Sequence, residues 1–443
     1  MRSCLILLLL GINIIYPVFA QPIFALKHCI EQGLANNYDI RVARNAQKMA
    51  DREVTLGNAG YLPAIDFSSG YQGDFNHWET RQNADGSGTN VYYNNLDQNF
   101  NAGVYLDWTL FDGLNMQINY AKLKELSKES ALNAQLTVEN FIAELSAEYY
   151  NLIRQQIQWS NLQYAVVLSR ERLRIVAERY DIGSLSRLDW QQAKVDFNAD
   201  SSRLIRQEEV LFASRVRLNQ LMGKYLVEEP VKTADTTIVV GQLPLENKEN
   251  LWQMTLDRNT ALLIALKEIS LGKLDLKSLQ SANYPYLKFN AGYGYTFNRY
   301  AIGTTSRQQN LGLSYGLTLG IRVFDGLNRS RKQDVAKMVI ENRKLQYDNL
   351  LLSIKSDFAN LWMAYCNDMG LTLLERENVH TAEDNYDIAI ERYKLGDLSG
   401  LELREAQNSL LEAEERLVNA LYSTKLCEIS LLQMSGQIGD LLK

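Results

Sequence analysis

Four segments of the chain alternate between apolar and polar side chains. They cover residues 65–76, 99–110, 287–298 and 310–323. In the second segment, one face carries only apolar side chains: Phe100, Ala102, Val104, Leu106, Trp108 and Leu110. A period of two residues predicts a β-strand. Each segment reaches the roughly 9–11 residues that a tilted membrane strand needs, and apolar-outward alternation with aromatics is typical of outer-membrane barrels.

A soluble antiparallel sheet with one wet face is the alternative explanation of this alternation. Its apolar face would need a covering layer, which the helices of this chain do not obviously supply. Four strands also cannot close a membrane barrel, because the smallest have about eight strands and open edges leave backbone groups unpaired in lipid. The pattern therefore favours a barrel that several subunits share. The polar segments 76–98 and 299–309 are predicted to be hairpin loops.

Long amphipathic segments predict the remaining structure. Between Gly113 and Gly183 there is no Pro or Gly, and apolar residues recur every three to four positions. A helix of about 65–70 residues there would be about 100 Å long. Further helices are predicted over residues 26–58, 188–222, 248–280, 328–395 and 401–434. Uncapped amphipathic runs of such length indicate a coiled-coil assembly.

The chain contains two copies of one unit. Phe111-Asp112-Gly113-Leu114-Asn115 and Glu178-Arg179-Tyr180 recur as Phe324-Asp325-Gly326-Leu327-Asn328 and Glu391-Arg392-Tyr393, both offset by 213 (324 minus 111, 391 minus 178). Leu34 and Asn37 match Leu256 and Asn259 at an offset of 222 (256 minus 34). Ordered matches at two consistent offsets indicate an internal duplication. We predict a first repeat over residues 21–227, a linker over 228–246 with a β-like run at 236–240, and a second repeat over 247–443.

The N-terminus predicts a signal peptide over residues 1–20. Arg2 supplies one positive charge, residues 5–15 contain an apolar run, and Ala20 ends a stretch with small residues. These features are those of a secretory signal cleaved after Ala20, and the run is too short to favour a spanning helix. A retained signal anchor is the alternative. Cys29 does not follow a lipobox, so no lipid anchor is expected.

Composition and motifs narrow the function classes. The net charge is −6 and there is no basic patch, so no nucleic-acid partner is predicted. The three histidines are far apart in the sequence, and no phosphate loop, metal-ligand cluster or nucleophile elbow is present. We therefore predict no enzyme activity, no cofactor and no metal site. Cys29, Cys366 and Cys427 are too widely spaced to indicate a disulfide framework.

Several features together resemble the TolC-like outer-membrane efflux proteins, over essentially the whole mature chain. They are the duplication, Tyr61-Leu62-Pro63, the two Phe-Asp-Gly-Leu-Asn segments and the two Arg-Tyr-x-x-Gly-x-Leu-Ser segments. The resemblance implies an α+β membrane protein and a homotrimer. Its subunits would share a twelve-stranded transmembrane antiparallel β-barrel, with four strands per chain, continued by a long α-helical coiled-coil barrel.

The same resemblance implies the function and the location. The chain would be a passive gated exit duct of a tripartite efflux or type I secretion system, exporting small molecules or polypeptides. It would lie in the outer membrane lipid of a Gram-negative cell, with its helical barrel in the periplasm. The expected partners are a periplasmic adaptor (membrane fusion) protein and an inner-membrane pump of RND or ABC type. A structural envelope scaffold or adhesin, anchored by a small trimeric β-barrel, is the alternative function.

The family's tip motif indicates where an adaptor would dock. It corresponds here to Gly183, Leu185 and Ser186, and to Gly396, Leu398 and Ser399. Gly permits the positive φ that ends a helix, and Ser caps the next helix. Leu185 and Leu398 are then expected to be exposed apolar contacts. The alternative is that all six residues only shape helical hairpins.

The resemblance also suggests a gate and an acidic ring. The family's entrance is closed partly by a bond between an Asp and a Tyr, which correspond by position to Asp189 and Tyr393. A second closing pair needs a Thr and an Arg, but Leu188 and Leu398 stand at those positions. An acidic ring inside the entrance corresponds to Glu402 and Glu405, which are three residues apart and share a helix face. Solvated surface glutamates are the alternative interpretation of this pair.

Overall fold

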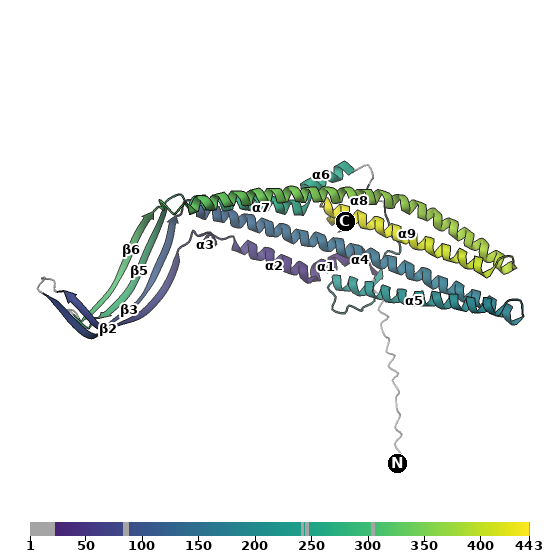
Figure 1. The fold of residues 1–443 in the computed structure, drawn as a ribbon, viewed down its shortest axis with the longest axis horizontal. Coiled ribbons are helices and arrows are strands. Elements are labelled where there is room, and N and C mark those ends of the chain that lie inside the picture. The colour runs from purple at the N-terminus through teal and green to yellow at the C-terminus, as the bar shows by residue number, and fades with distance from the viewer. Residues whose placement is uncertain (1–22, 83–87, 241–242, 244–247, 303–305, 443) are drawn as a thin grey trace, which may run out of the picture. The chain divides into compact units, whose positions relative to one another are not determined.

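The computed structural model describes residues 23–82, 88–240, 243, 248–302 and 306–442 (Figure 1). The predicted signal peptide, residues 1–20, lies outside the described residues. The chain divides into two compact units. Of the described residues, those within 1–41, 137–259 and 355–443 form unit 1, and those within 42–136 and 260–354 form unit 2. Each unit therefore takes residues from both predicted repeats, whose boundaries stay a prediction.

Unit 2 contains a four-stranded antiparallel sheet, which confirms the four predicted strands. The order is β2 (Ala64–Gln82), β3 (Thr89–Phe111), β5 (Tyr286–Arg299) and β6 (Arg307–Gly320). Strand β6 ends three residues before the predicted end at Val323. Within the described residues, β2 and β6 each pair with only one strand, so both edges of the sheet are open.

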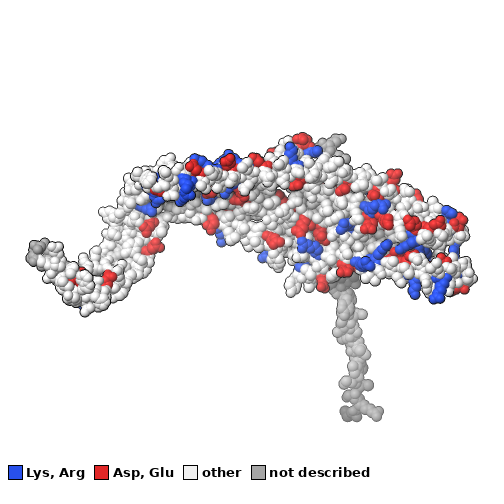
Figure 2. Space-filling model, in the orientation of Figure 1, with Lys and Arg blue, Asp and Glu red and all other residues white. Residues whose placement is uncertain are grey.

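The strand register keeps the two predicted faces apart. One row across the sheet joins Phe67, Val104, Tyr293 and Leu313, and these apolar side chains are exposed. A row on the opposite face joins Gln72, Asn99, Asn298 and Gln308. Figure 2 shows few charged side chains over the strands and many of both signs over the helices. The sheet is therefore two-faced, and its apolar face is left uncovered by its own chain.

The predicted loop over residues 76–98 is wrong. Strands β2 and β3 continue through most of it, and their pairing extends to Gln82 opposite Thr89. The pairing of β3 with β5 stops at Gln98 opposite Arg299. The β2–β3 hairpin therefore extends as a two-stranded ribbon beyond the four-stranded part. A polar sequence remains compatible with such a ribbon, because backbone hydrogen bonds hold it and neither face has to be apolar.

The two Phe-Asp-Gly-Leu-Asn segments form the corners that lead into the long helices. The Asp112 carboxylate accepts a hydrogen bond from the Met116 N–H at 3.1 Å, and the Asp325 carboxylate accepts one from the Arg329 N–H at 3.1 Å. Each Asp thereby satisfies an N–H group that the first turn of a helix leaves free. The repetition of this motif reflects a turn built twice with the same hydrogen bond.

The long helices confirm their predicted lengths. Helix α4 (Asn115–Asp181) has 67 residues and α8 (Asn328–Leu395) has 68. In unit 1 they fold back into α5 (Arg187–Leu221) and α9 (Gly400–Met434), giving two helical hairpins (Figure 1). None of the helices within the described part of the chain is both long and apolar enough to cross a lipid bilayer.

The helices predicted over residues 26–58 and 248–280 are interrupted, so the prediction of continuous helices was wrong. The first is α1 (Leu26–Asn36), α2 (Tyr38–Glu53) and α3 (Leu56–Ala59), and the second is α6 (Lys248–Arg258) and α7 (Thr260–Ser281). Asn37 stands at the first break, where its Oδ1 accepts the Asp39 N–H and its Nδ2 donates to Leu221 O at 3.4 Å. Asn259 stands at the matching break and donates to Met434 O at 3.0 Å. Each Asn thus ties a helix break to the last residue of α5 or α9.

The linker between the repeats holds a short strand in a different place from the predicted one. Strand β4 (Lys232–Thr233) pairs in parallel with β1 (Ile23–Phe24), whereas residues 236–240 form no strand. Nearby, the hydroxyl of the fully buried Tyr149 donates to the Asp235 carboxylate at 2.8 Å. This linker therefore packs onto α4 of unit 1.

Candidate functional site

The two helical hairpins of unit 1 end in matching turns at the same end of that unit (Figure 1). The first turn contains Gly183 and the second contains Gly396, with φ of +79° and +83°. A residue with a Cβ is strained in this left-handed region, so Gly ends the helix at the lowest cost. The structure thus places both predicted glycines where a helical hairpin reverses.

Each returning helix begins with a capping box. The Asp189 carboxylate accepts hydrogen bonds from the N–H and hydroxyl of Ser186, at 3.1 and 2.6 Å. Glu402 accepts the same two bonds from Ser399, at 2.9 and 2.7 Å. The bond from the Ser186 hydroxyl is the main cause that lowers the pKa of Asp189, and the bond from the Ser399 N–H is the main cause for Glu402. The Ser-x-x-Asp and Ser-x-x-Glu spacing in the sequence is sufficient to predict these partners.

Leu185 and Leu398 are half-buried, which corrects the expectation that they are exposed. Both pack against a cluster of buried residues that includes Tyr393 and joins the two hairpins. The Leu directly before each capping Ser therefore turns inward. Four other apolar residues are exposed at the tip: Ile182 (80%), Leu188 (75%), Leu395 (83%) and Leu401 (78%). We call these four the tip surface.

The tip surface consists of two pairs of equivalent residues. Leu395 is the repeat equivalent of Ile182, and Leu401 that of Leu188, at the repeat offset of 213 (395 minus 182, 401 minus 188). An exposed large apolar side chain is ordinary when it stands alone, whereas a cluster of them indicates a binding surface. The sequence contains the signal that would have found these residues, because both copies have an apolar residue at both positions.

A cavity of about 720 Å³ lies between the two tips, and both Asp189 and Tyr393 line it. Tyr393 is only 3% exposed. The Arg179 guanidinium lies 5.3 Å from its ring centre and donates to Tyr393 O at 3.3 Å. Burial raises the pKa of Tyr393. Within the described residues, no hydrogen bond joins the Tyr393 hydroxyl to the Asp189 carboxylate, which is bonded to Ser186.

The remaining predicted site residues lie near the start of α9. Glu402 and Glu405 are both exposed, and Glu402 belongs to the capping box. At the positions of the missing second closing pair, Leu188 is exposed and Leu398 is half-buried. No group of three or more His, Cys, Asp or Glu among the residues that the structure describes is placed to hold a metal ion.

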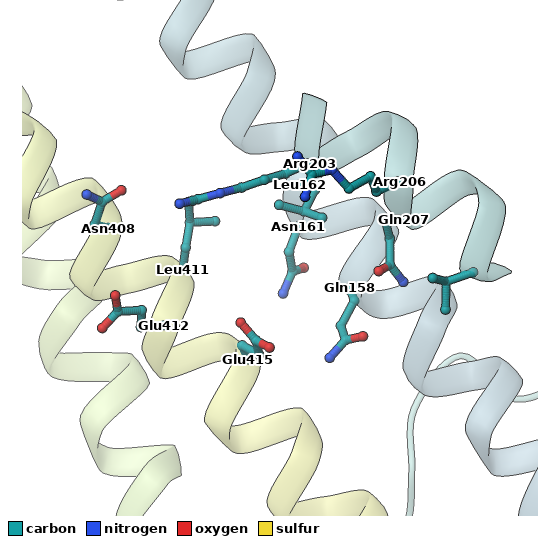
Figure 3. A pocket seen from close by; sticks show the side chains of 11 residues that line it. Gln158, Asn161, Leu162, Arg203, Arg206, Gln207, Asn408, Leu411, Glu412 and Glu415 are labelled. Atoms are coloured by element: carbon teal, nitrogen blue, oxygen red, sulfur yellow. The ribbon is translucent and has the colours of Figure 1, made fainter. Parts of the chain in front are cut away.

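A second hollow, of about 410 Å³, lies farther along the hairpins between α4, α5 and α9. Figure 3 shows Arg203 and Arg206 on α5 across from Glu412 and Glu415 on α9. Its lining combines charged and amide side chains with the apolar Leu162, Val210 and Leu411. The sequence could not predict this hollow, because its α9 wall lies about 200 residues or more from its α4 and α5 walls in the sequence.

The model of the outer membrane efflux protein family matches residues 29–224 and 251–437, which is most of the chain. The chain belongs to the outer membrane efflux protein family. This efflux protein is 19% identical to outer membrane protein TolC of Escherichia coli (strain K12) over 433 residues, which is 93% of this chain and 82% of TolC. It is also 19% identical to outer membrane efflux protein BepC of Brucella suis, over 91% of this chain and 83% of BepC.

A solved structure shares the fold of this efflux protein. The outer membrane channel CmeC of Campylobacter jejuni matches it with a TM-score of 0.77 at 17% identity, over 93% of this chain and 85% of CmeC. The chain is therefore an outer-membrane exit duct with its helices in the periplasm. The scaffold or adhesin alternative is not favoured. Members of this family are channels rather than enzymes.

Proposed function

We propose that three copies of this chain form one duct. The open edges of β2 and β6 and the uncovered apolar face of the sheet support this proposal. Joining β6 of one copy to β2 of the next would pair both edges and give twelve strands, three times the four of one chain. Twelve exceeds the minimum of about eight strands for a membrane barrel. The repeats over residues 21–227 and 247–443, joined by the linker 228–246, would each contribute one helical hairpin.

The tips of these hairpins form the periplasmic entrance and dock an adaptor protein, which connects the duct to an inner-membrane pump of RND or ABC type. The repeated, exposed tip surface is the observation that carries this proposal. In a trimer the two tip turns of each chain would give six similar apolar contacts around one axis. Gly183, Ser186, Gly396 and Ser399 shape the turns, and Leu185 and Leu398 anchor them to the buried cluster.

Replacing Ile182 and Leu395 by serine is expected to weaken adaptor binding. Burying an Ile or Leu side chain contributes roughly 1.5–3 kcal/mol, so the loss of both should raise the Kd by at least about tenfold. The measurement is the Kd between the detergent-solubilised trimer and the periplasmic adaptor of the same export system. Ser184→Ala changes an exposed polar residue of the same turn and serves as the control. An unchanged Kd for the Ile182→Ser/Leu395→Ser variant would exclude these two residues from docking.

We also propose that Glu405 forms the acidic ring at the entrance. Both glutamates are exposed, but the Glu402 carboxylate is bonded to Ser399. Carboxylates repeated around a pore attract cations and set ion selectivity. Glu405→Gln should therefore lower the cation preference more than Glu402→Gln does. The reversal potential of the channel under a KCl gradient measures this preference, and an equal shift for both variants would argue against a special role of Glu405.

The proposed gate consists of Asp189 and Tyr393. Both line the cavity between the tips, and they come from different hairpins, so a hydrogen bond formed between them in the assembled entrance would oppose the separation of the hairpins. Tyr393 is held in place by burial and by Arg179, while Asp189 is fixed at the start of α5 by its capping box. These restraints keep both side chains at the entrance.

A further inference from the structure

A buried charged cluster connects the two hairpins behind the proposed gate. Asp200 of α5 is only 1% exposed. Arg404 of α9 binds its two carboxylate oxygens at 2.6 and 2.8 Å, and the buried Ser169 of α4 donates its hydroxyl to the same carboxylate. A bidentate Arg–carboxylate pair is among the strong side-chain ion pairs. Here it joins the first hairpin to the second.

Three further contacts extend this connection. Arg172 of α4 is paired with Asp196 of α5 and donates to Gly400 O of α9 at 3.5 Å. Gln407 of α9 donates to Ala165 O of α4 at 3.3 Å. We call Ser169, Arg172, Asp196, Asp200, Arg404 and Gln407 the inter-hairpin cluster. It involves both helices of the first hairpin and the returning helix of the second.

The duplication does not reproduce this cluster. At the repeat offset of 213, the equivalents of Ser169, Arg172, Asp196, Asp200 and Arg404 are Ala382, Asn385, Ser409, Ala413 and Gln191. The tip turns, by contrast, are repeated. The charges are therefore not needed to build a helical hairpin, since the second hairpin forms without them. They stand only where the first hairpin meets the second within one chain.

We propose that the Asp200–Arg404 pair is a second link that holds the entrance closed, in place of the Thr–Arg pair that Leu188 and Leu398 cannot form. This inference rests on the proposed gate, because it assumes that opening separates the two hairpins of a chain. In the closed state both charges are desolvated, but they satisfy each other. Opening breaks this contact, so the pair joins the hairpins only in the closed state, although the cost of desolvating the two charges offsets part of the gain from pairing.

Two features make this pair suitable for release. Arg203 lies 3.9 Å from the Asp200 carboxylate and its own side chain is 57% exposed, so it is a second cation for Asp200 when Arg404 withdraws. Arg203 also lines the hollow in Figure 3, next to the cluster. Asp200 would therefore not be left without a partner as the hairpins separate.

Removing one partner should have a different effect from removing both. Arg404→Met removes the bidentate partner and leaves the Asp200 charge buried beside Ser169, with the weaker contact to Arg203 at 3.9 Å, so the closed state is destabilised. Opening relieves this by hydrating Asp200. The double variant Asp200→Leu/Arg404→Met fills the same space with apolar side chains, which are often as stable as a buried ion pair. Arg404→Met should open the channel, and the double variant should stay closed.

The experiment records the open fraction of the full-length trimer in planar bilayers. For Arg404→Met we expect a rise of roughly tenfold or more over wild type, and for the double variant a value near wild type. Arg416→Met is the matched control, because it makes the same substitution on α9 and breaks the ion pair with Glu375 inside one hairpin. It should leave the open fraction unchanged. The thermal midpoint of each trimer shows whether a variant is folded.

The outcomes separate this link from the proposed gate. If Asp189→Ala/Tyr393→Phe opens the channel and folded Arg404→Met does not, the link is wrong and the gate stands. If Arg404→Met opens it and the gate variant does not, the link stands without the gate. An equal rise for Arg404→Met and Arg416→Met would show a general loosening of α9 and overturn the proposal. If the Arg404→Met trimer cannot be isolated while the double variant assembles and conducts like Arg416→Met, the result supports the link. If both Arg404→Met and the double variant fail to assemble, the result contradicts it.

Discussion

Replacing Leu313 by arginine is expected to prevent assembly of the duct, whereas replacing its neighbour Ser314 by arginine should be tolerated. Leu313 belongs to the apolar face of the sheet, in the row with Tyr293, and is 68% exposed. Ser314 points to the opposite face, where its hydroxyl donates to Gly292 O at 3.3 Å. The two residues are adjacent in the middle of β6, so they differ in the face and hardly in position.

The expected loss of assembly in the Leu313→Arg variant is large because a charged side chain is costly in contact with lipid. An arginine on the lipid face of a barrel costs about 2–4 kcal/mol near the bilayer midplane, and a trimer would carry three copies, about 6–12 kcal/mol in all. An arginine on the inner face remains in water and should shift ion selectivity toward anions. The measurement is the yield of trimer that resists unfolding in detergent, after folding into lipid. Equal yields of the two variants would show that the apolar face does not meet lipid.

The strands illustrate how far a sequence pattern reaches. Where one face must be apolar, alternation located all four strands, including the row with Phe67 and Leu313. Between residues 76 and 98 the alternation fades, yet Trp78 still pairs with Tyr93 and Gln82 with Thr89. A ribbon held by backbone hydrogen bonds needs no apolar face, and its sequence therefore resembles a loop. Alternation of apolar and polar residues reveals a strand with one apolar face. Strands that pair without such a face leave no alternation in the sequence.

The breaks in the helices also could not be predicted from the local sequence pattern. The duplication identified Asn37 and Asn259 as equivalent, but helical periodicity continued through both positions and concealed the breaks. What ends each helix is a hydrogen bond from the Asn side chain to a carbonyl at the end of α5 or α9. That partner is about 180 residues away in the sequence, so no local window contains it. An Asn repeated at the same place in both copies was the available signal.

In the candidate site, too, the features set by neighbouring residues were predictable, and those set by packing between the hairpins were not. The turns at Gly183 and Gly396 and their capping serines follow from local chemistry, and the structure places them as predicted. The direction of Leu185 and Leu398 depends on the packing of two hairpins, which the sequence does not reveal. The Asp200–Arg404 pair joins residues 204 apart, and a single sequence contains no reason to connect them.

The gate variant Asp189→Ala/Tyr393→Phe is expected to conduct more than wild type. Asp189 holds the first turn of α5 and faces the same cavity as Tyr393, which lies on the other hairpin. If the closed state loses about 1 kcal/mol per subunit, the trimer loses about 3 kcal/mol, and the ratio of open to closed channels rises roughly 100-fold. The measurement is single-channel conductance and open probability in planar bilayers, with the trimer confirmed by its mass.

Glu402→Ala is the control that gives this experiment its meaning. Glu402 is the repeat equivalent of Asp189 and makes the same two hydrogen bonds, to Ser399, but it does not line the cavity with Tyr393. Its removal should loosen the start of α9 as much as removal of Asp189 loosens α5, at a cost typical of a lost helix cap. If the open probability rises in Asp189→Ala/Tyr393→Phe but not in Glu402→Ala, the gate lies at the cavity. An equal rise without Glu402 would attribute opening to loosened helix starts, and the Asp189–Tyr393 gate would have to be abandoned.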